Sequence, residues 1–282
     1  MRLDQYLAQI HPEVSRHYLK ELIEAGKILV NGQPTEPSYR LNESDELTVN
    51  IPPKPGSRVT PEKLPLKIIY EDQDILVIDK PAGQVTHPAV GHRSGTLVNA
   101  VLGHVNLTGV GEETRPGLVH RLDKDTSGLI VIAKNEETRL ELVKAFKNRT
   151  IHKEYLALVS GHLDEPAGEI NQPIDRDKRN RLKFTVSQSG KPAVTRYFTE
   201  ASYPNHTLLR VEPLTGRTHQ IRVHLAHLHH PIVGDRLYGG EAAPRLFLHA
   251  AKLSFRLKSE ERTFTSDLPK DLKMLLDSQR AA

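Results

Sequence analysis

Five prolines fall within the fourteen residues 52–65, and this stretch is the strongest single constraint on the fold. Proline fixes its own backbone angle and has no amide hydrogen, so a segment this rich in it cannot continue a helix or a central strand. We therefore interpret residues 53–65 as a linker that divides the chain into residues 1–52 and residues 66–282.

Residues 1–52 carry the patterns of a small unit of helices and strands. Apolar residues recur at helical spacing across residues 2–10 and again across residues 14–25. The next segment, "KILVNGQP", predicts a strand followed by a hairpin turn at Asn31-Gly32, and "DELTVNI" predicts a last alternating strand.

Residues 66–282 mix strands and helices without strict alternation. Strands are predicted within 67–83, 153–161, 193–213 and 246–257, and helices within 95–105, 137–149, 219–228 and at the C-terminus. In the sequence, predicted strands neighbour other strands as often as they neighbour helices. This predicts an α+β domain whose central sheet is mixed, largely antiparallel and flanked by helices. The same pattern argues against a Rossmann or barrel fold.

The composition limits the chemistry that the chain can perform. It has 282 residues and no cysteine, which removes disulfides, thiolate nucleophiles and cysteine zinc sites. No apolar run approaches the length of a membrane helix, and the first residues lack a signal-peptide pattern, so we expect a cytoplasmic protein. The net charge of +4 favours RNA only slightly. The basic run 176–183 is either a solvated face or part of a phosphate-binding groove.

Residues 116–135, "PGLVHRLDKDTSGLIVIAKN", interrupt an apolar sequence with a charged cluster. Asp123 and Asp125 are two apart and would project to one side of an extended backbone, as in a carboxylate pair or a metal site. The alternative is a solvated polar turn formed by residues 126–128. The residues alone leave both interpretations open.

Residues 216–235, "GRTHQIRVHLAHLHHPIVGD", hold five histidines within twelve positions. On a helix, His224 and His227 would share a face and could ligate a metal. No glutamate separates histidines as in the zinc-protease signature, and Asp235 is the only nearby carboxylate. Packing and hydrogen-bonding roles for the histidines are the alternative.

Three motifs in a fixed order resemble pseudouridine synthases of the RluA type. H-R-L-D-x-x-T-S-G is matched from His120 to Gly128, K-x-Y at Lys153 and Tyr155, and G-R-T-H-Q-I-R-x-H from Gly216 to His224. Ahead of them, "SRHYLKELIEAGKILVNGQP" resembles the S4 RNA-binding domain. The resemblance covers nearly the whole chain.

This resemblance implies a fold and an activity. It implies a pseudouridine synthase fold behind an S4 domain, and isomerisation of uridine to pseudouridine within RNA, without a metal or other cofactor. An S4 unit joined to these motifs is similar to the RluD-like branch, which modifies large-subunit (23S) ribosomal RNA, although some relatives modify tRNA. We expect a monomer whose partner is RNA.

The resemblance also assigns roles to single residues. Asp123 is implied to act at the ribose, either attacking the anomeric carbon or removing the C2′ proton. Arg222 is implied to keep that carboxylate charged through its bidentate fork. Tyr155 would stack on the detached base and help to remove its C5 proton, and Arg121 would displace the target base from the RNA. Asp125 falls at a variable position of the motif.

The remaining predicted contacts are with RNA. His120 and Arg217 are expected beside the substrate, and Arg16, Lys20 and Lys27 of the S4 region are expected to face phosphates. Two rival functions are a non-catalytic S4-type RNA-binding factor and a metal-dependent hydrolase that uses the histidines. The first would require the loss of a catalytic group, yet all three implied catalytic residues are present.

Overall fold

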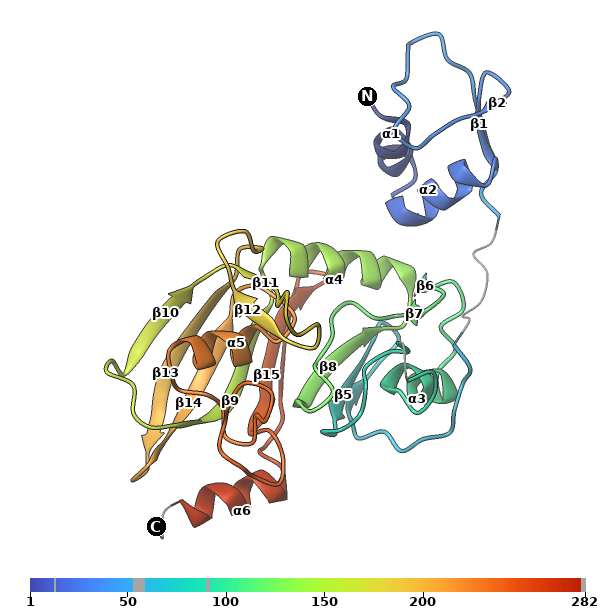
Figure 1. The fold of residues 1–282 in the computed structure, drawn as a ribbon. Helices are drawn as coiled ribbons and strands as arrows, with labels where there is room; N and C mark the ends of the chain where they lie inside the picture. Colours follow the sequence, from blue (N-terminus) through green and yellow to red (C-terminus); the bar gives the residue numbers. More distant parts are fainter. Residues whose placement is uncertain (13, 53–58, 90–91, 280–282) are drawn as a thin grey trace.

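The computed structural model describes residues 1–12, 14–52, 59–89 and 92–279 (Figure 1). Residues 53–58 of the predicted linker and residues 280–282 of the predicted terminal helix lie outside the described residues. Among the described residues, no helix combines the length and the apolar character needed to span a membrane.

The first unit contains two helices and a three-stranded antiparallel sheet. Its elements are α1 (Leu3–Ile10), α2 (Arg16–Glu24), β1 (Ile28–Val30), β2 (Gln33–Pro34) and β3 (Leu47–Val49), with the strand order β2-β1-β3. Asn31 and Gly32 have φ of 53° and 75°, as a tight hairpin of the predicted kind requires. Leu3, Leu7, Leu19 and Ile28 are fully buried and form the centre of this small core.

The second unit is organised by one nine-stranded sheet. Its path is β10-β13-β14-β9-β15-β8-β5-β4, and β16 adds to β15. The bounds are β4 (Ile68–Glu71), β5 (Ile75–Lys80), β8 (Ser127–Ala133), β9 (His152–Ser160), β10 (Ala167–Asn171), β13 (Val194–Ser202), β14 (His206–Pro213), β15 (Leu248–Leu257) and β16 (Glu260–Thr265). Every pairing in this sheet is antiparallel except that of β8 with β15, which confirms the predicted fold class.

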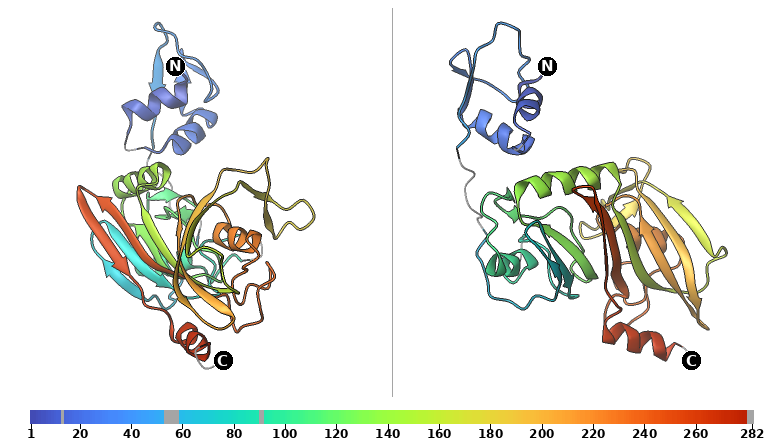
Figure 2. Two further views of the ribbon diagram at one scale, coloured as in Figure 1. Left: turned by 90° about the vertical axis from the view of Figure 1, so that its left-hand side faces the viewer. Right: turned by 180° about the vertical axis from the view of Figure 1, so that it is seen from behind.

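Helices cover this sheet, and two small hairpins extend from it. The helices are α3 (Leu97–His104), α4 (Glu136–Asn148), α5 (Gln220–His227) and α6 (Lys270–Ser278); the hairpins are β6 (Gly111–Glu112) with β7 (Arg115–Pro116), and β11 (Ile174–Arg176) with β12 (Phe184–Val186). Helix α4 packs on β8 and β15, and α5 covers β13 and β14 (Figure 2). Asn135 caps α4 by accepting the Thr138 amide at 2.9 Å.

Strand β8 begins at Ser127, two residues earlier than a turn over residues 126–128 would allow. The turn falls on Lys124 and Asp125, whereas Ser127 and Gly128 already belong to the buried strand. Our interpretation of Ser127 and Gly128 as turn formers was therefore wrong, whereas Thr126 closes the turn by donating its amide to the Asp123 carbonyl oxygen at 3.2 Å. The physical reason is a distant partner: β8 runs parallel to β15 through Ser127 opposite His249 and Gly128 opposite Ala250.

Gly128 is required where β8 meets β15. Its φ is +112°, and a Cβ atom there would lie 2.3 Å from the Ala250 carbonyl oxygen. The neighbouring Ser127 hydroxyl lies 2.9 Å from Nδ1 of the fully buried His249. Together these contacts fix the end of the loop that carries the charged motif.

Replacing Gly128 with alanine should lower the free energy of unfolding by about 3 kcal/mol or more, because the new methyl group would collide with the β15 backbone. Gly109→Ala is the matched control: its φ is +80°, but nothing lies within 4 Å of the added Cβ. We expect the control to lose only about 1 kcal/mol. Chemical denaturation of both variants checks this, and equal losses would contradict the steric explanation.

Candidate active site

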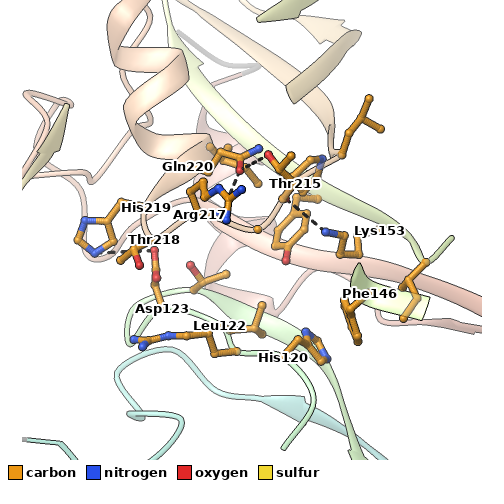
Figure 3. A pocket seen from close by; sticks show the side chains of 18 of the residues that line it. His120, Leu122, Asp123, Phe146, Lys153, Thr215, Arg217, Thr218, His219 and Gln220 are labelled. Carbon is orange, nitrogen blue, oxygen red and sulfur yellow. Dashed lines mark hydrogen bonds and ion pairs between the residues drawn. The ribbon is translucent and has the colours of Figure 1, made fainter. Parts of the chain in front are cut away.

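The three sequence motifs meet in one cavity of about 490 Å³ (Figure 3). The loop 119–123 forms one wall, Lys153 and Tyr155 of β9 form another, and the segment 213–222 between β14 and α5 closes the site. The volume lies within the usual range for a small-molecule site, roughly 300–1,000 Å³. Segments that are far apart in the sequence therefore supply one pocket.

Asp123 lies in this cavity between two nitrogen groups. Its side chain is 18% exposed, and its Oδ2 atom lies 3.7 Å from Nη1 of Arg222 and 3.9 Å from Nε2 of His219. Both distances exceed a direct hydrogen bond. The carboxylate is thus held near positive and polar groups while one side stays open to the cavity.

The sequence resemblance predicted that the Arg222 guanidinium would bind Asp123 through two of its nitrogens. In the structure it does not. Its Nε and Nη2 atoms donate to the two oxygens of Asp235, at 2.7 and 2.8 Å, and both side chains are almost completely buried. Burial opposes the guanidinium charge, but the Asp235 hydrogen bond and the nearby carboxylates outweigh it, so the pKa of Arg222 is raised. Only Nη1 faces Asp123. Sequence reasoning had considered Asp235 solely as a metal ligand.

Lys153 and Tyr155 are two apart on β9 and therefore project to the same face. Burial, and after it the charge of Asp123, raises the pKa of Tyr155, so the phenol stays protonated. Burial lowers the pKa of Lys153 to about 8, and its Nζ lies 3.5 Å from the Thr215 carbonyl oxygen. This wall of the cavity thus offers an aromatic ring beside a weakly basic amine.

His120 lines the same cavity but has structural partners. Its Nε2 accepts the backbone amide of Val131 at 3.0 Å, and its ring stacks on Phe146 with centroids 4.7 Å apart. Burial, and then the charge of Lys153, lowers the pKa of His120 to about 3. The imidazole is therefore neutral and joins β8 to α4, so it could face the substrate only as a neutral ring and not as a cation.

Arg121 and Arg217 differ in whether their guanidinium groups have hydrogen-bond partners. Both are exposed and line the cavity, but Arg217 Nε donates to the Pro192 carbonyl oxygen at 3.1 Å. In the part of the chain that the structure describes, Arg121 has no hydrogen-bond or ion-pair partner. Arg121 therefore keeps all its donors available.

Two of the three predicted S4 cations hold a buried carboxylate. Asp4 is fully buried; Arg16 donates to it at 3.1 and 2.8 Å, and Lys20 Nζ lies 3.6 Å away. Burial would raise the pKa of Asp4, but the hydrogen bonds from Arg2 and Arg16 bring it below its ordinary value. Arg16 and Lys20 remain 45% and 39% exposed, and Lys27 is exposed.

The histidine cluster does not converge on one point. His224 is buried and uses both ring nitrogens, with Thr195 Oγ1 at 2.8 Å and the Gln172 carbonyl oxygen at 2.9 Å, whereas His227 is exposed. Among the described residues, metal-type ligands gather only at His152, Glu154 and Glu212. There Glu154 is paired with Lys252, and Glu212 with Arg210.

The comparisons with known proteins agree with this geometry. A family model described as "RNA pseudouridylate synthase" matches residues 74–227, and one described as "S4 domain" matches residues 1–47. The chain belongs to the RNA pseudouridylate synthase family.

Relatives in this family match over almost the full length. The chain is 39% identical to the "Uncharacterized RNA pseudouridine synthase YlyB" of Bacillus subtilis (strain 168), covering 99% of this chain and 94% of the relative. It is 38% identical to "Ribosomal large subunit pseudouridine synthase D" of Escherichia coli (strain K12), covering 99% and 91%. The solved structure of "Human RNA Pseudouridylate Synthase Domain Containing 1" matches with a TM-score of 0.59 at 27% identity, covering 81% of this chain and 98% of that one.

This pseudouridine synthase also contains a buried lysine that sequence reasoning missed. Lys80, at the end of β5, is fully buried and donates to the carbonyl oxygens of Pro81, Gln84 and Lys124 at 2.9 to 3.1 Å. Lys124 is the residue after Asp123, so the ammonium helps to hold the loop that carries Asp123. The available signal was a pair of charged residues, Asp79 and Lys80, at the end of a strand that is buried throughout.

Burial lowers the pKa of Lys80 to about 8, although the charges of Asp123 and Asp125 act in the opposite direction. The unfolded chain binds this proton up to about pH 10.5, so stability should rise with pH between about 8 and 10.5, by at most ~3 kcal/mol. Lys80→Met lacks this group. The free energy of unfolding of wild type relative to Lys80→Met should therefore increase across that window in urea titrations. A constant difference would show that Lys80 does not titrate there.

Proposed function

We propose that this pseudouridine synthase acts on large-subunit (23S) ribosomal RNA and that Asp123 is its reacting carboxylate, without a cofactor. The observation that carries the proposal is the convergence of Asp123, Tyr155 and Arg222 in one cavity from three distant segments. The names of relatives matched over nearly their whole length, such as the Escherichia coli enzyme, support the RNA class. The protein acts as a monomer in this proposal.

The reaction breaks one bond and forms another on the same ribose carbon. Asp123 either displaces N1 of the uracil from C1′ or removes the C2′ proton while the C1′–N1 bond breaks. The uracil leaves with the bonding electron pair and turns within the cavity, and its C5 atom then forms the bond to C1′. In the first route this step breaks the bond between Asp123 and C1′, and in the second Asp123 returns its proton to C2′. Loss of the C5 proton and protonation of N1 complete an isomerisation that consumes no other reactant.

Tyr155 and Arg222 serve this sequence in different ways. The protonated phenol of Tyr155 offers a ring for stacking and a hydrogen-bond donor rather than an anionic base. The Nη1 atom of Arg222 stabilises negative charge on Asp123 while the other nitrogens keep their hydrogen bonds to Asp235. In this proposal Tyr155 therefore serves the detached base, whereas Arg222 serves the carboxylate.

The uridine must leave its stack before it can enter the cavity, at a cost of a few kcal/mol. Arg121, exposed at the cavity and without a partner among the described residues, is placed to fill the space that the flipped base leaves. The hairpin of β11 and β12 carries Arg176, Lys178, Arg179, Arg181 and Lys183, and with the S4 cations it supplies contacts to phosphates.

Asp123→Asn should abolish modification, lowering the single-turnover rate by at least about a thousandfold. Asp125→Asn is the matched control, because Asp125 is exposed and lies two positions away on the same loop. Pseudouridine mapping across total RNA, in cells without the gene complemented by each variant, provides the readout. Sites in 23S RNA that return with Asp125→Asn but not with Asp123→Asn support the proposal. Sites restored by Asp123→Asn, or found only in tRNA, would overturn it in part.

Removal of residues 1–52 should weaken RNA binding and reduce its salt dependence. Each phosphate contact that is lost should flatten the plot of log Kd against log salt by about 0.7 to 0.9. The melting transition of the remaining domain should change little, because its own sheet and core lie within residues 68–276. Equal affinities of the truncated and full-length proteins across a salt titration would remove the S4 unit from the proposal.

A further inference from the structure

His219 has a backbone conformation that histidine rarely adopts. It immediately precedes α5 with φ 56° and ψ 18°, in the left-handed region. The surrounding turn is held by Gln220, whose Oε1 accepts from the Thr215 hydroxyl at 2.6 Å and from the Arg217 amide at 3.0 Å. Conformations of this kind persist where the surroundings enforce them, and they concentrate at functional sites.

The hydrogen bonds around His219 determine which ring nitrogen carries the proton. The Phe184 amide donates to the Tyr238 hydroxyl oxygen at 2.9 Å, and that hydroxyl lies 2.9 Å from Nδ1 of His219. When the Tyr238 hydrogen is donated to Nδ1, the imidazole proton is on Nε2. The opposite tautomer would direct a lone pair at the Asp123 carboxylate and is disfavoured.

Aromatic neighbours fix the plane of the imidazole ring. The rings of Phe184 and Tyr238 lie edge-on to it, with centroids 5.6 and 5.7 Å away. Burial lowers the pKa of His219 despite the opposing charge of Asp123, so the ring is neutral near pH 7. Figure 3 shows Nε2 directed toward Asp123, at 3.9 Å from Oδ2.

We propose that His219 is a positioning residue: its Nε2–H, held by Tyr238, orients the Asp123 carboxylate for reaction. Arg222 cannot do this alone, because Asp235 occupies its fork and only Nη1 faces Asp123. Two donors on Oδ2 leave the other oxygen directed at the substrate. The 3.9 Å distance shortens to a hydrogen bond when RNA fills the cavity, as is usual for catalytic contacts that are long in the free enzyme. This inference rests on the proposed role of Asp123.

Two amide substitutions of His219 distinguish a role as hydrogen-bond donor from a role in the backbone turn. In His219→Gln the amide nitrogen lies near the position of Nε2, so a donor toward Asp123 is kept. In His219→Asn the amide reaches only the position of Nδ1, although asparagine tolerates the left-handed backbone better. A role in the backbone turn alone would therefore favour asparagine, whereas a donor role favours glutamine.

The experiment measures the single-turnover rate of pseudouridine formation, the Kd for the same RNA and the melting temperature of each full-length variant. We expect His219→Asn to lower the rate about tenfold to a hundredfold with Kd unchanged, and His219→Gln to remain within a fewfold of wild type. Tyr238→Phe, which removes the group that fixes the tautomer, should fall between them.

Three outcomes would overturn the inference: a wild-type rate for His219→Asn, equal rates for the two amides, or a wild-type rate for Tyr238→Phe. Asp123→Asn is measured in parallel. If Asp123→Asn is inactive while all three other variants match wild type, only the role of His219 fails. If Asp123→Asn is active, the proposed function itself fails.

Discussion

The buried ion pair between Arg222 and Asp235 is the interaction on which the rest of the site depends. A buried guanidinium is tolerated only when its charge and hydrogen bonds are satisfied, and Asp235 supplies both through two short contacts. Asp235 also accepts the backbone amides of Leu237 and Tyr238 at 3.2 Å. Tyr238 is thereby fixed with its ring facing the Arg222 guanidinium, whose Cζ lies 5.0 Å from the ring centroid. The Tyr238 hydroxyl contacts His219. One carboxylate thus anchors both groups that face Asp123.

Most of the fold could be predicted from local patterns, because periodicity and turn chemistry act within a few residues. The hairpin at Asn31-Gly32 is an example, since the two residues that favour the turn are those that form it. The prediction failed at Ser127 and Gly128 for the opposite reason. Glycine is required at position 128 because β15, more than a hundred positions away in the sequence, lies against it. No local pattern distinguishes a glycine needed for such a contact from a glycine needed for a turn.

In the candidate site, too, local motifs predicted some features, whereas others depend on tertiary structure. Motif resemblance identified Asp123, Tyr155 and Arg222, and the structure places all three in one cavity. It could not reveal which carboxylate occupies the Arg222 fork, because pairing is a property of tertiary structure. Nor could the sequence separate the histidines: His224 bonds to β13 and to the chain before β11, whereas His219 points at Asp123.

The short parallel contact between β8 and β15 determines when the enzyme can become competent during its own synthesis. The loop bearing Asp123 is complete once β8 has been made, yet its end is fixed by His249 and Ala250, which are translated more than a hundred residues later. A nascent chain can therefore fold its local S4 unit long before its carboxylate is in place. In such an early chain the S4 unit would be folded while the cavity that holds Asp123 is still incomplete.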